Sequence, residues 1–324
     1  TGEEIAVPQA GLEQASSAYQ AAVRDLERTK ASVNENIRQA QSSLDDLKSN
    51  SSDDLTATEQ AVATANTNLK NTQTTYQQSI DNARASALII MDNKLSVAQA
   101  ALDFVNTILT NDEIDELISV KNPNYINLTE SNYLEAVAYL NSSRSKLEKA
   151  VMDDDNSAVL DALDESSMAL NKTFAALTDL FSALENSETG TNLNQSSLDS
   201  YKASASTHQA SVATGQNSIQ TAKQTLENAI INYNSQVATA ESALATAQAS
   251  YNDAVISASK ALNTAQLTGE QQLTAAESKV DTSEEAMSLA KAQYEQTIAP
   301  ANTYDVGLAR AQLKQAQAAY DAIV

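Results

Sequence analysis

The 324-residue sequence contains no cysteine, and it has only 6 glycines, 3 prolines and 3 phenylalanines. Without cysteine the chain has no disulfide framework and no thiolate chemistry. So few glycines and prolines argue against a loop-rich globular domain, and an aromatic share of 4% argues against a thick hydrophobic core. Alanine, serine, threonine, glutamine, asparagine and leucine dominate instead, which is typical of helices that face water along most of their surface.

Cationic residues are also scarce. The chain has 20 lysines and arginines against 42 aspartates and glutamates, and its formal net charge is −22 at pH 7. An acidic surface of this kind repels phosphate backbones and anionic lipid headgroups. The longest apolar run, residues 87–91, is far shorter than the roughly 20 residues of a membrane-spanning helix. We therefore expect no nucleic-acid partner and no membrane span in this segment.

Two long stretches, residues 12–90 and 198–298, carry an apolar residue at every seventh position. The main row of the first begins with Leu12, Tyr19, Leu26, Val33, Ala40 and Leu47, and that of the second with Leu198, Ala205, Val212, Ile219, Leu226, Tyr233, Ala240, Ala247 and Ala254. Together with a companion row three or four residues away, each forms one stripe along a helix, the seam of a coiled coil. Each stripe needs a partner, and the simplest partner is the other stripe. The sequence predicts an all-α fold based on a long antiparallel coiled-coil hairpin.

The first stretch contains a polar patch, residues 48–54, that permits two interpretations. The patch is either a turn or the polar face of one unbroken helix. The eleven-residue step from Leu44 to Leu55 keeps the stripe on nearly the same helix face, which favours an unbroken helix. That helix is expected to begin just after Pro8, where a missing N–H costs nothing. In the second stretch, glycine at position 269 is expected to loosen the helix.

Between residues 86 and 196 large apolar residues become denser. Their stripe, which includes Leu88, Ile89, Met91, Leu95, Leu102, Phe104, Val105, Ile108 and Leu109, is wide enough to be buried on several sides. Two further helices follow, one with Thr129 as its N-cap and one that begins after the acidic residues 153–155; Ser196 or Ser197 is expected to cap the last long helix. These features predict an inserted helical domain, resembling a four-helix bundle, at the distal end of the hairpin.

The expected organisation therefore has four segments. They are a first coiled-coil rod at 1–85, a helical bundle insertion at 86–196, a second rod at 197–298, and a linker with a short C-terminal helix at 299–324. The residues Ala299 and Pro300 are expected to end the second rod, because proline cannot continue a helix.

His208 is the only histidine in the chain, and it lies at the edge of the second seam. No second histidine or cysteine accompanies it as a metal ligand or catalytic partner. We interpret it as a partly exposed helix residue.

Residues 153–164 resemble a calcium loop in part. Asp153, Asp155 and Ser157 supply its alternating oxygen ligands, but Ala158 occupies the position that requires glycine, and Asp164 stands where glutamate is expected. Helix-capping acids are the better interpretation. Because no nucleophile elbow or glycine-rich phosphate loop is present either, we expect no enzyme, no catalytic residue, no metal site and no cofactor.

Residues 12–26, 240–248 and, above all, 305–320, with the sequence DVGLARAQLKQAQAAY, resemble the α-helical hairpin of HlyD-type membrane fusion proteins. These are the periplasmic adaptor subunits of efflux and secretion pumps. The resemblance implies a stalk that bridges a transporter to an envelope partner or assembles with copies of itself. It departs from the family at residues 86–196, where the family has a short loop.

Two function classes follow from these observations. The first is a structural adaptor module, the extracytoplasmic stalk of a transporter-associated membrane fusion protein. The alternative is a bacterial cell-surface or filament-forming coiled-coil protein whose helical bundle binds a ligand or partner. For both we expect protein partners, including a possible homo-oligomer, and a location in the periplasm or at the cell surface of a bacterium, because the lack of cysteine and the low lysine content suit such a place.

Overall fold

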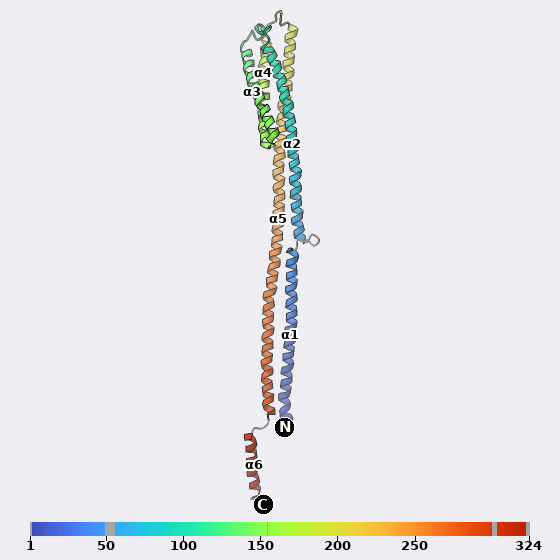
Figure 1. Cartoon of the computed structure of the whole chain (residues 1–324), viewed down its shortest axis with the longest axis vertical. Helices are drawn as coiled ribbons and strands as arrows, with labels where there is room; N and C mark the ends of the chain where they lie inside the picture. Colours follow the sequence, from blue (N-terminus) through green and yellow to red (C-terminus); the bar gives the residue numbers. More distant parts are fainter. Residues whose placement is uncertain (1, 49–55, 154, 300–302, 322–324) are drawn as a thin grey trace. The chain divides into compact units, whose positions relative to one another are not determined.

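A computed structural model describes residues 2–48, 56–153, 155–299 and 303–321 (Figure 1). Its elements are α1 (Gly2–Lys48), α2 (Ala57–Leu109), the 3-10 helix η1 (Asp115–Leu117), α3 (Asn124–Asp153), α4 (Asn156–Glu185), α5 (Gln195–Ile298) and α6 (Thr303–Asp321). No strand occurs within these ranges. The predicted all-α class is confirmed.

The chain divides into two compact units. Unit 1 comprises residues 1–62 and 247–324, and unit 2 comprises residues 63–246. Helices α2 and α5 each contribute residues to both units. The four-segment organisation, with boundaries after residues 85, 196 and 298, stays a prediction.

In unit 1, α1 and the C-terminal part of α5 run in opposite directions (Figure 1). Near the end of α1, the Tyr251 hydroxyl donates a hydrogen bond of 2.8 Å to the Leu47 carbonyl. Closer to its start, Lys279 Nζ lies 3.2 Å from Asp25 Oδ2. The predicted seam row of α1 lies on the inward face, because every member described is at least half-buried and Val33 is only 3% exposed.

Gly269 allows a close approach between these two helices. A Cβ atom built at this glycine would lie only 2.5 Å from Cγ1 of Val33. The glycine was expected to loosen α5, yet the helix is continuous through it. The intrinsic cost of about 1 kcal/mol for glycine in a helix is offset here by contact with the partner helix.

Two expectations about the first stretch are wrong. Helix α1 begins at Gly2 rather than after Pro8, so that the proline lies inside the helix. The expected unbroken helix falls partly on residues 49–55, which lie outside the described residues. At Thr56 the chain is not helical, and a capping box starts α2: Thr56 N donates to Glu59 Oε2 at 3.1 Å, and Glu59 N donates to Thr56 Oγ1 at 3.5 Å.

Unit 2 has one hydrophobic core, to which α2, α3, α4 and the first part of α5 contribute. Its largest fully buried side chains are Met91, Leu95, Leu102, Leu140, Leu163, Leu170, Leu177, Leu180, Leu184, Leu193, Ile219 and Leu226. The buried residues of α4 recur every three or four positions, so the helix places a broad apolar face against the other three.

Helices α4 and α5 are joined by a ladder of polar contacts with seven-residue spacing. Lys223 donates to Asp164. Seven residues later on α4 and seven residues earlier on α5, Gln216 donates to Asn171 at 2.8 Å, and after another seven residues in the same directions Gln209 donates to Thr178 at 3.3 Å. The order of the rungs shows that α4 and this part of α5 are antiparallel and keep one register over two heptads.

The helix caps in unit 2 are partly those expected. Asp155 caps α4, as predicted, by accepting a hydrogen bond of 3.2 Å from Ser157 N. The predicted cap Thr129 is wrong: it is buried inside α3, and its hydroxyl donates to the Tyr125 carbonyl. Asn122 lies before this helix, and its side chain accepts a hydrogen bond of 3.2 Å from Asn124 N instead.

The start of α5 is also capped by an asparagine. The side chain of Asn194 accepts a hydrogen bond of 2.9 Å from Ser197 N. The expected caps Ser196 and Ser197 therefore lie inside the first turn. Helix α5 ends at Ile298, just before Ala299 and Pro300, as predicted.

Candidate protein-binding groove

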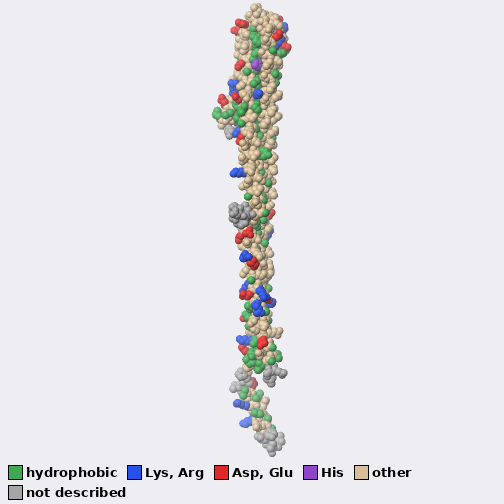
Figure 2. Space-filling model, turned by 90° about the vertical axis from the view of Figure 1, so that its right-hand side faces the viewer, with side chains coloured by type: hydrophobic (Ala, Val, Ile, Leu, Met, Phe, Trp, Pro, Cys, Tyr) green, Lys and Arg blue, Asp and Glu red, His purple; other side chains and the backbone are tan. Residues whose placement is uncertain are grey.

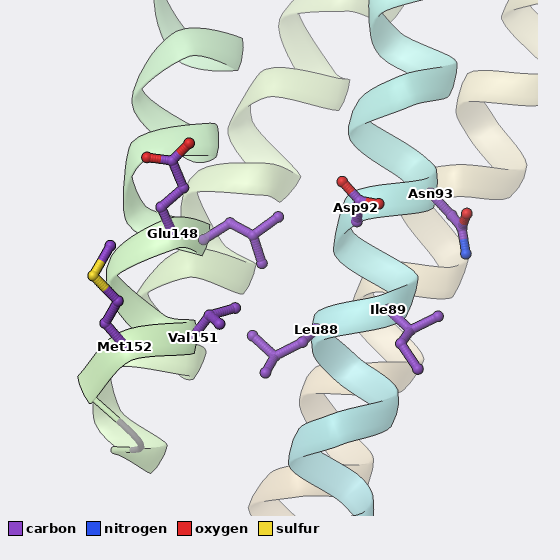
Figure 3. A pocket seen from close by; sticks show the side chains of 8 residues that line it. Leu88, Ile89, Asp92, Asn93, Glu148, Val151 and Met152 are labelled. Atoms are coloured by element: carbon purple, nitrogen blue, oxygen red, sulfur yellow. The ribbon is translucent and has the colours of Figure 1, made fainter.

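An open apolar groove of about 500 Å³ lies between α2 and α3 in unit 2 (Figure 3). Its lining residues are Leu88, Ile89, Asp92, Asn93, Leu147, Glu148, Val151 and Met152. We call it the α2–α3 groove. Leu88 and Val151 point toward each other across it, whereas Ile89 and Met152 flank it on the outer sides of the two helices (Figure 3). Figure 2 shows apolar side chains gathered at the surface near the level of the turn between α3 and α4.

The residues behind the groove fix its walls. On α2, Ala87 and Met91 are fully buried, so that the intervening Ile89 faces away from the core and is 65% exposed. On α3, Ala150 is buried, and the next two residues, Val151 and Met152, are 59% and 77% exposed. Core packing thus holds both helices in place while Ile89, Val151 and Met152 remain exposed to water.

Both charged residues that line the groove are carboxylates. Asp92 projects from the α2 wall and Glu148 from the α3 wall, and both are exposed. Neither has an ion-pair partner among the described residues. The groove therefore combines an apolar floor with a negatively charged rim.

A second, more polar hollow of about 620 Å³ lies between α2 and α5, also in unit 2. It is lined by Tyr76, Ser79, Asn82, Ala83, Ser86, Thr225, Asn228, Ala229 and Asn232. Its last residue on α2, Ser86, lies only two positions before Leu88 of the α2–α3 groove.

His208 occupies the position expected of a partly exposed helix residue. Its ring stacks on Phe104 of α2, with the ring centroids 5.0 Å apart. The imidazole is half-buried, and burial lowers its pKa below the ordinary value of 6.5. Within the described residues no group of three or more histidines, cysteines, aspartates and glutamates is placed to hold a metal ion.

The acids of the partial calcium loop have separate structural contacts. Asp153 is the last residue of α3 and is exposed, and Asp155 caps α4. Asp164 accepts from Lys223 on another helix, so it is directed away from the turn. Residue 154 lies outside the description. The structure does not bring the described acids together as a ligand set.

The loop between α2 and α3 is hydrogen-bonded to the loop between α4 and α5. Glu188 N donates to the Leu117 carbonyl at 2.9 Å, and Lys121 N donates to the Asn186 carbonyl at 2.9 Å. Between these bonds, the buried Ser119 has a φ of 58° and donates its N–H to Ser187 Oγ at 3.0 Å. These hydrogen bonds stabilise the positive φ of Ser119. They also pair the backbone N–H groups of Ser119, Lys121 and Glu188 with acceptors in the neighbouring loop.

Sequence reasoning missed the α2–α3 groove. It placed Ile89 in the buried stripe of a bundle helix, and this is wrong, because Ile89 faces solvent. The one available signal was the pair Val151 and Met152, large apolar residues placed directly before an acidic helix end. Large apolar residues at the end of a helix, beside acidic residues, are too close to water to be buried in the core.

No helix in the described part of the chain is both long and apolar enough to span a membrane. No protein-family model, no curated protein and no solved structure matches the chain.

Proposed function

We propose that the chain is a non-enzymatic structural adaptor whose helical bundle binds a protein partner at the α2–α3 groove. The observation that carries the proposal is the exposure of Val151, Met152 and Ile89 around this groove, beside a core in which comparable side chains are fully buried. An exposed apolar surface with a polar rim is a feature of protein interaction sites.

The proposed architecture is an antiparallel coiled-coil hairpin that carries the bundle. In unit 1 it is supported by the opposed directions of α1 and α5 and by the close contact of Val33 with Gly269. In unit 2 it is supported by the heptad-spaced contacts between α4 and α5. A hairpin of this kind suits a spacer, because its seam needs few large apolar residues for its length.

The resemblance of residues 305–320 to HlyD-type adaptors extends the proposal. On this basis the module is an extracytoplasmic stalk that connects a transporter to an envelope partner or assembles with copies of itself. The groove then recognises a protein of that assembly.

The alternative, a bacterial cell-surface or filament-forming coiled-coil protein, is favoured by one observation on α6. Its apolar residues Val306 and Leu313, which are seven positions apart, are 39% and 66% exposed, and Leu308 is 57% exposed. An apolar row that remains in water can pair with another helix, including one from a second copy.

Site-specific photo-crosslinking in the cells that make the protein tests the adaptor proposal. A photoreactive amino acid at Met152 should give one discrete covalent adduct with another protein. The control carries the same group at Ile231, an apolar residue of α5 with a similar exposure of 62%. Equal adduct patterns from the two positions, or adducts only with small molecules, would contradict the proposal.

A further inference from the structure

We infer that the occupant of the α2–α3 groove is a cationic amphipathic helix of a partner protein. The inference rests on the proposed adaptor function and adds the chemical class of the partner. It follows from the shape of the groove, the residues of its floor and the sign of its rim.

The shape of the groove fits a helix. Its walls are two helices, and lining residues recur at i and i+4 on each of them: Leu88 and Asp92 on α2, and Leu147 and Val151 on α3. A helix laid between two others presents apolar side chains with the same three-to-four-residue spacing. A groove of about 500 Å³ has room for a few large side chains, as expected for anchors on one helix face.

The floor suits apolar anchors of varied shape. Leu88, Leu147 and Val151 supply branched aliphatic surface, while Met152 at the edge has an unbranched thioether that adapts to different partners.

The rim selects the charge of the occupant. Asp92 and Glu148 stand on opposite walls, and lysines or arginines on both flanks of a bound helix would lie near them. A second copy of this chain is a poor occupant, because each copy carries a net charge of −22. Charge thus favours a basic partner over self-association.

Fluorescence anisotropy with two synthetic helical peptides tests the inference on the full chain. Both peptides are about 18 residues long, or five helical turns, with leucines at i, i+3, i+4 and i+7; one has lysine at the remaining positions and the other glutamate. The lysine peptide should bind to the wild-type chain, and the glutamate peptide should not bind.

Variants with matched controls separate groove binding from general attraction to an acidic protein. Val151→Asn should weaken binding of the lysine peptide about tenfold, the effect of losing one anchor contact, whereas Ile231→Asn should leave it unchanged. The double variant Asp92→Asn/Glu148→Gln should weaken it more than Glu130→Gln/Glu241→Gln, which alters net charge equally at exposed carboxylates elsewhere in unit 2. Circular dichroism confirms that each variant is folded.

Equal affinities for Val151→Asn and Ile231→Asn, or equal binding of the two peptides, would overturn the inference. A dimer that Val151→Asn converts to a monomer in sedimentation would overturn it as well, in favour of a second copy. The photo-crosslinking result is independent of peptide charge. An adduct at Met152 without selectivity for the lysine peptide supports the adaptor function and excludes only a cationic helix as the partner. Selectivity for the lysine peptide without an adduct at Met152 shows that the groove binds cationic helices and contradicts the adaptor function.

Discussion

The single histidine is an internal probe of the packing between α2 and α5. Burial against Phe104 lowers the pKa of His208, so we expect NMR titration of its ring protons to give a midpoint below 6.5. Phe104→Ala should admit water and return the midpoint toward 6.5, and Tyr294→Ala, which removes a ring near the C-terminal end of α5, should not. A midpoint at or above 6.5 in the wild-type chain would contradict the stacked arrangement.

The pH dependence of stability follows from the same shift. Because the pKa of His208 is lower in the folded chain, the unfolded chain takes up the proton more readily. The free energy of unfolding should therefore fall as the pH drops through 6.5 toward the folded pKa, and it should be independent of this residue above that window.

Apolar packing outweighs ion pairs in unit 2. Leu170 is fully buried in the core of unit 2, so Leu170→Ala should lower the free energy of unfolding by about 2–5 kcal/mol. The pair of Lys223 and Asp164 is partly exposed to water, with side-chain exposures of 26% and 60%. Lys223→Ala should cost only about 0.2–1 kcal/mol. Urea denaturation measures both, and a larger loss for the lysine variant would refute this ranking.

At the scale of helices, the register between α1 and α5 can be trapped covalently. A Cβ at position 269 would lie 3.6 Å from Cβ of Val33, which is within the usual Cβ separation of a disulfide, about 3.5–4.5 Å. Since the chain has no cysteine of its own, Val33→Cys/Gly269→Cys should form one intramolecular disulfide under mild oxidation. Gel mobility with and without reductant measures it.

The matched control for this crosslink is Val33→Cys/Gln271→Cys. Gln271 is exposed and lies two residues further along α5, about 200° around the helix. It should crosslink much more slowly. Equal rates for the two pairs would show that α1 and α5 do not keep the register described here.

The seven-residue periodicity of the sequence correctly predicted which faces of the long helices are buried. The rows that include Val33 and Leu226 lie on the inward faces because a seven-residue apolar repeat has few alternatives in water. Helix ends were harder to predict. At Thr56 a capping box, which was not recognised from the sequence, starts a new helix although the apolar repeat continues. Asn122 and Asn194 accept the hydrogen bonds at the starts of α3 and α5, where Thr129, Ser196 or Ser197 had been expected to do so. Exposure of Ile89 could not be predicted, because it depends on which face of α2 the inserted helices cover.

At the scale of the whole molecule, the two units should differ in local stability. The core of unit 2 contains large side chains with at most 1% exposure, such as Leu163 and Leu177, whereas most seam residues of α1 are only half-buried. Opening unit 1 therefore exposes less apolar surface per residue. Hydrogen exchange with mass spectrometry should find slower amide exchange in α4 than in α1. Faster exchange in α4 would contradict this difference.

The central claim is that a partner protein binds in the α2–α3 groove. It is tested most directly by the yield of the photo-crosslinked adduct from Met152 in two otherwise identical chains, one of which also carries Val151→Asn. We expect Val151→Asn to reduce the yield of the adduct greatly and Ile231→Asn to leave the yield unchanged. An adduct of undiminished yield in the Val151→Asn chain would contradict the claim.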